Sequence, residues 1–114
     1  MKDVICSYLT INGRSPVKAF INSLDRRTQL KFYNARDLLE QFGRRLTEPH
    51  AKQIEKNLFE LRFIGIEGKI RVLYFFFHHN EAIFINGFVK KTQKAPKREI
   101  TTALKRRKMF LNNQ

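Results

Sequence analysis

Several residue types that mark particular protein classes are scarce in this 114-residue sequence. The single cysteine, Cys6, cannot form an internal disulfide, which favours a reducing cytoplasm, and we expect it to be a small buried strand residue. The longest apolar run, Val72 to Phe77, falls far short of the ~20 residues of a membrane-spanning helix. The N-terminus carries an early acid and lacks the apolar core of a signal peptide, so we expect a cytoplasmic protein that does not enter a membrane.

Motifs of several enzyme classes are also missing from the sequence. It has no glycine-rich phosphate loop, no serine or cysteine triad motif and no paired-carboxylate signature. The histidines, His50, His78 and His79, lack further ligands at metal-binding spacing, so we expect neither a metal nor a small-molecule cofactor. A histidine remains a possible general base, because the imidazole pKa suits proton transfer near neutral pH.

Acidic residues are scarce as well: ten Asp and Glu face 23 Lys and Arg, which gives a net charge of +13. We expect one domain over residues 1–114, since the length is typical of a single domain. A small domain with this excess charge repels itself, which indicates a polyanion or an acidic partner. Nucleic acid is the favoured partner, and an anionic membrane surface is the weaker alternative.

The hydrophobic periodicity predicts an α+β fold in the order strand, helix, helix, three strands, helix. We expect a small antiparallel sheet of about four strands, with the two N-terminal helices on one face and the other face partly open. The segment from Arg44 to Asn57, broken by Pro49, is expected to be irregular or briefly helical. The expected elements are strands at 4–11, 58–64, 69–77 and 82–89, and helices from Pro16, from Asp25 to Gly43, and from Lys97 to Leu111.

Arg62 and Arg71 interrupt two of the apolar strands and are the first candidate catalytic residues. If these strands form a hairpin, both guanidinium groups can point from the same face and fork onto a phosphate. Attack of an RNA 2′-hydroxyl on phosphorus builds negative charge on the phosphate oxygens, and fixed cations lower that barrier. The alternative is that each arginine pairs with a surface acid, Glu60 or Glu67, and lays its stem along the sheet.

The stretch from Phe88 to Phe110 contains nine Lys or Arg residues and one acid, Glu99. Lys90, Lys91 and Lys94 follow the third of the later strands, and a lysine crowded by cations can become a proton donor or acceptor near neutral pH. The helix cations are expected to bind the nucleic-acid backbone, or otherwise to form a solvated face. We expect Lys94 and the helix residues Lys97, Arg98, Lys105 and Arg106 to bind nucleic acid.

Three motifs in the C-terminal half resemble the RelE/ParE superfamily of toxins, in particular its phage-derived HigB-like branch. They are Leu-x-Glu-Leu-Arg at Leu58–Arg62, Arg-Val-x-Tyr-Phe at Arg71–Phe75, and Gly-Phe-Val-Lys-Lys-Thr-Gln-Lys-x-Pro at Gly87–Pro96. The resemblance implies a RelE-like fold and a toxin of a type II toxin–antitoxin pair. Related toxins are metal-independent messenger-RNA interferases that cut transcripts on the ribosome, and a small helix-turn-helix antitoxin neutralises them.

Carried over by position, Arg62 and Arg71 match the sheet arginines that hold the scissile phosphate, and Lys90 and Lys91 match the basic pair after the last strand. The late tyrosine of RelE and the C-terminal histidine motif of some HigB relatives are missing between Lys90 and Lys108. Base stacking could fall to Phe88 or Phe110. ParE-like relatives poison DNA gyrase instead, and a non-catalytic nucleic-acid-binding module is a further alternative.

Overall fold

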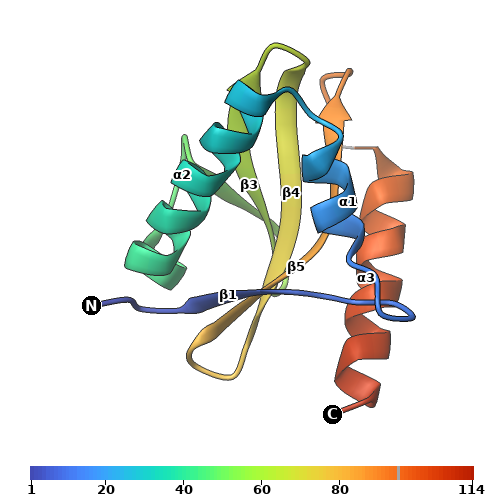
Figure 1. The fold of residues 1–114 in the computed structure, drawn as a ribbon. Coiled ribbons are helices and arrows are strands. Elements are labelled where there is room, and N and C mark those ends of the chain that lie inside the picture. Colours follow the sequence, from blue (N-terminus) through green and yellow to red (C-terminus); the bar gives the residue numbers. More distant parts are fainter. Residues whose placement is uncertain (95) are drawn as a thin grey trace.

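A computed structural model describes residues 1–94 and 96–114, so Ala95 of the Gly87–Pro96 motif lies outside the described residues. The described residues form a five-stranded sheet and three α-helices (Figure 1). In chain order the elements are β1 (Ile5–Tyr8), α1 (Pro16–Asn22), α2 (Arg26–Phe42), the short 3-10 helix η1 (Gly43–Arg45), β2 (Ala51–Glu55), β3 (Leu58–Gly65), β4 (Gly68–Phe77), β5 (Glu81–Lys90) and α3 (Lys97–Asn112).

The sheet is mixed, which corrects the expected antiparallel sheet of about four strands. Its strand order is β1-β5-β4-β3-β2. β2, β3, β4 and β5 pair antiparallel with their neighbours, whereas β1 pairs parallel with β5. α1, α2 and the strands β2, β3 and β4 lie between β1 and β5 in the chain. This long connection allows β1 and β5 to run in the same direction. The α+β class itself is confirmed.

β2 is the fifth strand, and it lies in the segment that we expected to be irregular or briefly helical. Ala51 pairs with Leu61 and Gln53 with Phe59, and an irregularity follows before Glu55 pairs with Leu58. Pairing with the strongly apolar β3 therefore supplies the order that the polar β2 sequence does not encode by itself. Because β2 begins at Ala51, it leaves the edge of β3 beyond Leu61 without a β2 partner.

The two N-terminal helices begin at the residues that the sequence indicates and cover one face of the sheet. Ser15 accepts a hydrogen bond from the backbone N–H of Lys18, and Asp25 accepts one from that of Arg27. α2 ends at Gly43, whose φ of 55° favours glycine. The core beneath these helices is formed by apolar side chains of α1, α2 and alternate strand positions, among them Val17, Ile21, Phe32, Leu39, Ile70, Val72, Tyr74 and Phe84.

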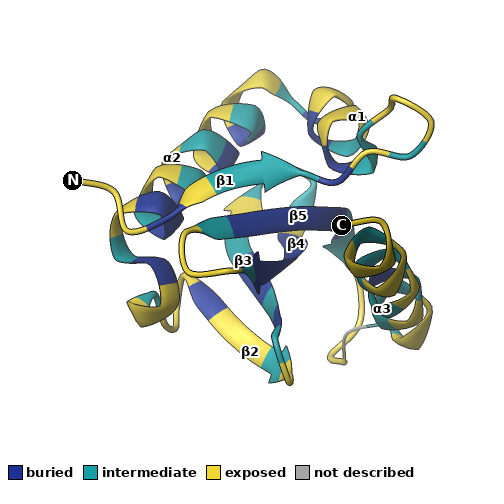
Figure 2. Ribbon diagram, turned by 90° about the horizontal axis from the view of Figure 1, so that it is seen from below, coloured by how far each residue is buried: buried dark blue, intermediate teal, exposed yellow. Residues whose placement is uncertain are grey.

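α3 covers part of the opposite face, so that face is less open than expected. Ala103 of α3 is fully buried in a second core cluster with Leu73, Phe75 and Ile85 of the sheet. Figure 2 shows the sheet lying between α1 and α2 on one side and α3 on the other. Phe110 near the end of α3 contacts Phe75 and Phe77, with ring centroids 5.5 and 5.1 Å apart. The helix therefore covers the part of the face near Phe75 and Phe77, away from the β3–β4 turn.

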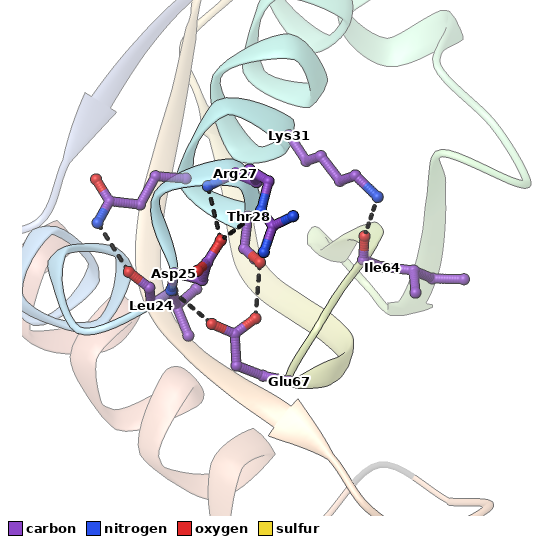
Figure 3. A network of polar contacts seen from close by, with 8 residues as sticks. Leu24, Asp25, Arg27, Thr28, Lys31, Ile64 and Glu67 are labelled. Atoms are coloured by element: carbon purple, nitrogen blue, oxygen red, sulfur yellow. Dashed lines mark hydrogen bonds and ion pairs between the residues drawn. The ribbon is translucent and has the colours of Figure 1, made fainter.

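A carboxylate in the β3–β4 turn anchors the start of α2 (Figure 3). Oε2 of Glu67 accepts a hydrogen bond of 2.6 Å from the backbone N–H of Asp25, and Oε1 accepts one of 2.7 Å from the Thr28 hydroxyl. The Lys31 ammonium donates to the carbonyl oxygen of Ile64 at 2.9 Å. Glu67 thus binds the N-terminus of the helix. The sequence left open a pairing of Glu67 with Arg62 or Arg71, and in the structure it pairs with neither.

Candidate nucleic-acid site

Two rows of side chains cross three strands close to the β3–β4 turn. In the first row Arg62 of β3 lies opposite Arg71 of β4, which lies opposite Phe88 of β5. In the second row Lys69 lies between Ile64 and Lys90. Directly opposite residues of a sheet share a face, and Arg71 alternates with Val72, which belongs to the α1–α2 core. Arg62, Lys69, Arg71 and Lys90 therefore lie on the face that α3 partly covers, and we call these four side chains the cation cluster.

Glu60 organises the two arginines of the cation cluster. The Nε and Nη2 atoms of Arg62 each lie 3.1 Å from the Oε1 atom of Glu60. The Nε atom of Arg71 lies 3.7 Å from its Oε2 atom, beyond hydrogen-bonding distance. The side chains of Glu60 and Arg71 are only 4% and 7% exposed. The arginine–Glu60 pairing that we considered as the alternative to a functional role is therefore present.

This pairing leaves unsatisfied hydrogen-bonding capacity inside the site. Among the described residues, the Arg71 Nε and the Glu60 Oε2 have no hydrogen-bond partner, while Nη1 of Arg71 donates to the Ile70 carbonyl oxygen at 3.1 Å. A buried polar group without a partner costs roughly 1–3 kcal/mol. The two unsatisfied atoms lie 3.7 Å apart, so this capacity faces the space between Arg71 and Glu60.

Arg62 is the accessible member of the arginine pair. Its Nη1 atom lies 3.1 Å from Oε1 of Glu48, a side chain that is 63% exposed, whereas Arg62 itself is 21% exposed. An ion pair with so exposed a partner contributes only about 0–1 kcal/mol. A phosphate can therefore replace Glu48 at Arg62 at little cost, while Glu60 keeps the guanidinium in place.

Lys90 lies close to the other members of the cation cluster. The pKa of its ammonium is lowered from the ordinary value, first by partial burial and next by the charge of Arg71. Arg62 and Lys69 act in the same direction, and Glu60 opposes them. At a given pH, a larger fraction of Lys90 is therefore in the neutral amine form than for an isolated lysine.

The other predicted cations lie elsewhere or have different contacts. Lys91 lines a separate hollow beside the first turn of α3, together with Arg98 and Glu99. Arg106 donates to the Ile85 carbonyl oxygen at 3.3 Å and so helps to hold α3 on β5. The exposed members of the predicted set are Lys91, Lys94, Lys97, Arg98 and Lys105. They form a basic margin around α3 and the segment before it, outside the cation cluster.

The aromatic candidates for base stacking are occupied in the core. Phe88 is buried in the α3-side cluster, and Phe110 packs on Phe75 and Phe77. Tyr74 and Phe75 are buried as well. His50, by contrast, lies in the same groove as Arg62 and Arg71, and its carbonyl oxygen accepts the backbone N–H of Arg62 at 2.8 Å.

Sequence reasoning missed two contributors to the site. Lys69 was treated only as the start of a strand, although its spacing of two from Arg71 predicts the same face. Glu48 comes from the segment before β2, and nothing in its sequence context indicates a contact with Arg62. Burial and then the Glu40 charge raise the pKa of the Cys6 thiol to about 12, which disfavours the thiolate form.

Neither a metal site nor a membrane segment is found in the part of the chain that the structure describes. Over residues 1–94 and 96–114, no three His, Cys, Asp or Glu side chains come together in a way that could hold a metal ion. Within the same residues, no helix has both the length and the apolar character to cross a membrane.

Comparison with known proteins identifies a family. No curated protein matches the chain. Residues 19–108 match the model of the family described as phage derived protein Gp49-like (DUF891), and this range contains α2, β2 to β5 and most of α3. That family is associated with toxin–antitoxin toxins of the RelE/HigB type. The match spans well over half of the sequence, and the chain therefore belongs to the Gp49-like family of phage-derived proteins.

Proposed function

We propose that this protein is the toxin of a type II toxin–antitoxin system and a ribosome-dependent, metal-independent messenger-RNA interferase that acts in the cytoplasm and stops translation. The observation that carries the proposal is that Arg62 and Arg71 lie directly opposite each other on neighbouring strands. Lys69 lies two residues before Arg71 on the same strand, and Lys90 lies opposite Lys69. Its other partner would be a small helix-turn-helix antitoxin, and the Gp49-like family supports that pairing.

The proposed chemistry is attack of an RNA 2′-oxygen on the adjacent phosphorus. A bond forms from the 2′-oxygen to phosphorus as the bond to the 5′-oxygen breaks. One proton leaves the 2′-hydroxyl and one reaches the 5′-oxygen, which yields a 2′,3′-cyclic phosphate and a 5′-hydroxyl. Arg62 and Arg71 stabilise the charge on the phosphate oxygens, and Lys90, with its lowered pKa, takes part in proton transfer.

Cutting of a message on translating ribosomes tests the proposal. Arg71→Ala should abolish cutting, but it also leaves the buried Glu60 carboxylate without its second cation and can weaken the fold. Arg71→Lys keeps the charge and loses the fork, so it should lower the rate by ~10²–10³ while the protein stays folded. Arg107→Lys is the matched control, because the Arg107 guanidinium bonds the carbonyl oxygens of Lys56 and Asn57 away from the cation cluster.

Intact transcripts with the wild-type protein would contradict the nuclease assignment. DNA-damage signalling without translation arrest, and little dependence on Arg71, would instead support a ParE-like poison of DNA gyrase. Salt-dependent RNA binding without cleavage would leave a non-catalytic nucleic-acid-binding module.

A further inference from the structure

A groove of about 450 Å³ lies between α2 and the part of β3 that has no β2 partner. Its apolar wall includes Leu38 of α2, Pro49 and Phe63 of β3. Arg62 and Arg71 line the same groove, so it adjoins the cation cluster directly. The groove opens where β3 extends past the start of β2, which is a consequence of the short fifth strand.

The groove combines an apolar wall with groups that recognise anions and base edges. The Asn34 side chain offers both a donor and an acceptor, and the His50 imidazole is a flat surface on which a base can stack. Lys31 and Lys69 add positive charge, and none of the described residues that line the groove is acidic. Arg71, whose side chain is 7% exposed, adds a second guanidinium to the lining beside that of Arg62.

We propose that this groove binds an unpaired nucleobase, the one adjoining the phosphate that Arg62 and Arg71 hold. The inference rests on the proposed function, and it assigns base binding to α2 and the segment before β2. Its volume falls in the range of small-ligand sites, about 300–1,000 Å³. A stable protein partner instead needs roughly 800 Å² of contact surface on each side, far more than one groove of this size offers.

Binding of an RNA that cannot be cut tests the inference independently of cleavage. The probe is a fluorescein-labelled hexamer with 2′-O-methyl groups throughout, compared with the same hexamer carrying one abasic position. Loss of a stacked base should weaken binding to the wild-type protein at least about five-fold, since base stacking is worth ~1–3 kcal/mol per base. Fluorescence anisotropy at fixed salt measures both affinities.

Filling the groove should remove this discrimination. Asn34→Phe places a ring in the groove from an exposed α2 position, and the abasic penalty should then disappear. Gln41→Phe, at an exposed α2 position away from the groove, should keep the full penalty. If Asn34→Phe does not fold, Asn34→Met tests the same position with a flexible, helix-favouring side chain.

An equal penalty in all three proteins, no penalty in the wild type, or no binding of the hexamer would overturn the inference. Ribosomal cleavage by a wild-type protein without the penalty would leave the proposed function standing and the base site wrong. A penalty without any cleavage would do the reverse. If hydrogen exchange at Asn34 is slowed by the antitoxin and not by the hexamer, the groove is a protein-docking surface and the inference fails.

Discussion

At the scale of single residues, the charge of Glu60 governs the site. The buried Glu60 carboxylate forms an ion pair with Arg62 and lies close to Arg71. Its negative charge raises the pKa of Lys90, against the effect of the neighbouring cations. Buried ion pairs contribute little net stability, because desolvation offsets their attraction. We therefore interpret Glu60 as a positioning residue that holds two guanidinium groups side by side.

Replacing Glu60 with glutamine should lower the pKa of Lys90 further. The substitution removes the negative charge of Glu60, which acts against Arg71, Arg62 and Lys69. An NMR titration of the Lys90 ammonium measures the change, and Glu55→Gln, at an exposed position of β2, is the control. An unchanged or raised pKa in Glu60→Gln would show that Glu60 does not act on Lys90.

The placement of individual residues on sheet faces could be predicted, whereas their partners could not. Strict alternation in β3 and β4 puts Arg62 and Arg71 on one face, and the structure has them directly opposite each other. The burial of Glu60 could not be predicted, because Glu is rarely buried and only the fold brings both arginines to it. The contact of Arg62 with Glu48 depends on the turn before β2, and Pro49 marks this turn without indicating which strand residue Glu48 meets.

At the scale of elements, α2 is fixed at both of its ends. Glu67 holds its first turn, and near its last turn Glu40 accepts the backbone N–H of Cys6 in β1 and pairs with the Lys2 ammonium, both at 2.9 Å. These contacts tie the start of the helix to the β3–β4 turn and its last turn to the edge strand β1. The position of α2 above β3, and hence the groove, depends on them.

The Glu40 contacts should make the fold sensitive to acid. Burial by itself would raise the pKa of Glu40, but the Cys6 N–H and the Lys2 ammonium outweigh it, and the pKa is lowered. The resulting stability is present above the unfolded value of 4.5 and is lost as pH falls through the lower folded pKa. Glu40→Gln should therefore lose less unfolding free energy than the wild type between about pH 5 and 3.

Urea unfolding at several pH values measures this difference, with the exposed Asp37→Asn as control. Parallel pH profiles for the wild type and Glu40→Gln would contradict the role given to Glu40.

The elements with strong apolar periodicity could be predicted, and the weakly patterned one could not. β3, β4, β5 and the three helices have clear patterns or caps, and their existence follows from the sequence. The sequence of β2 is Ala-Lys-Gln-Ile-Glu, which has low strand propensity. The strand forms because it can pair with the free edge of β3. The parallel β1–β5 pair is a long-range contact that no local pattern indicates.

At the scale of the whole molecule, two cores on opposite faces leave the arginine end of the sheet for ligand contact. The first core lies under α1 and α2 and the second under α3, and the cation cluster lies at the margin of the second, where Phe88 is opposite Arg71. The charge of +13 adds a long-range attraction for a polyanion. We propose that the basic margin around α3 and the cation cluster have separate tasks, which are backbone attraction and phosphate positioning.

Salt dependence should separate these tasks. Each phosphate that a lysine neutralises contributes about −0.7 to the slope of log affinity against log salt for single-stranded RNA. Lys105→Gln, at an exposed position, should reduce the slope by about that amount if it contacts a phosphate, and leave ribosomal cleavage at low salt intact. Arg107→Gln should leave the slope unchanged, since that guanidinium bonds backbone carbonyls. Equal slopes for all three proteins would remove Lys105 from the RNA interface.

The chemistry of the cut ends tests the central claim most directly, because the cation cluster is proposed to stabilise attack by the RNA's own 2′-oxygen. The account predicts 2′,3′-cyclic phosphate and 5′-hydroxyl ends, and no cut at a position that carries a single 2′-deoxynucleotide. Ends that bear a 3′-hydroxyl, or cutting that persists at the 2′-deoxy position, would contradict it.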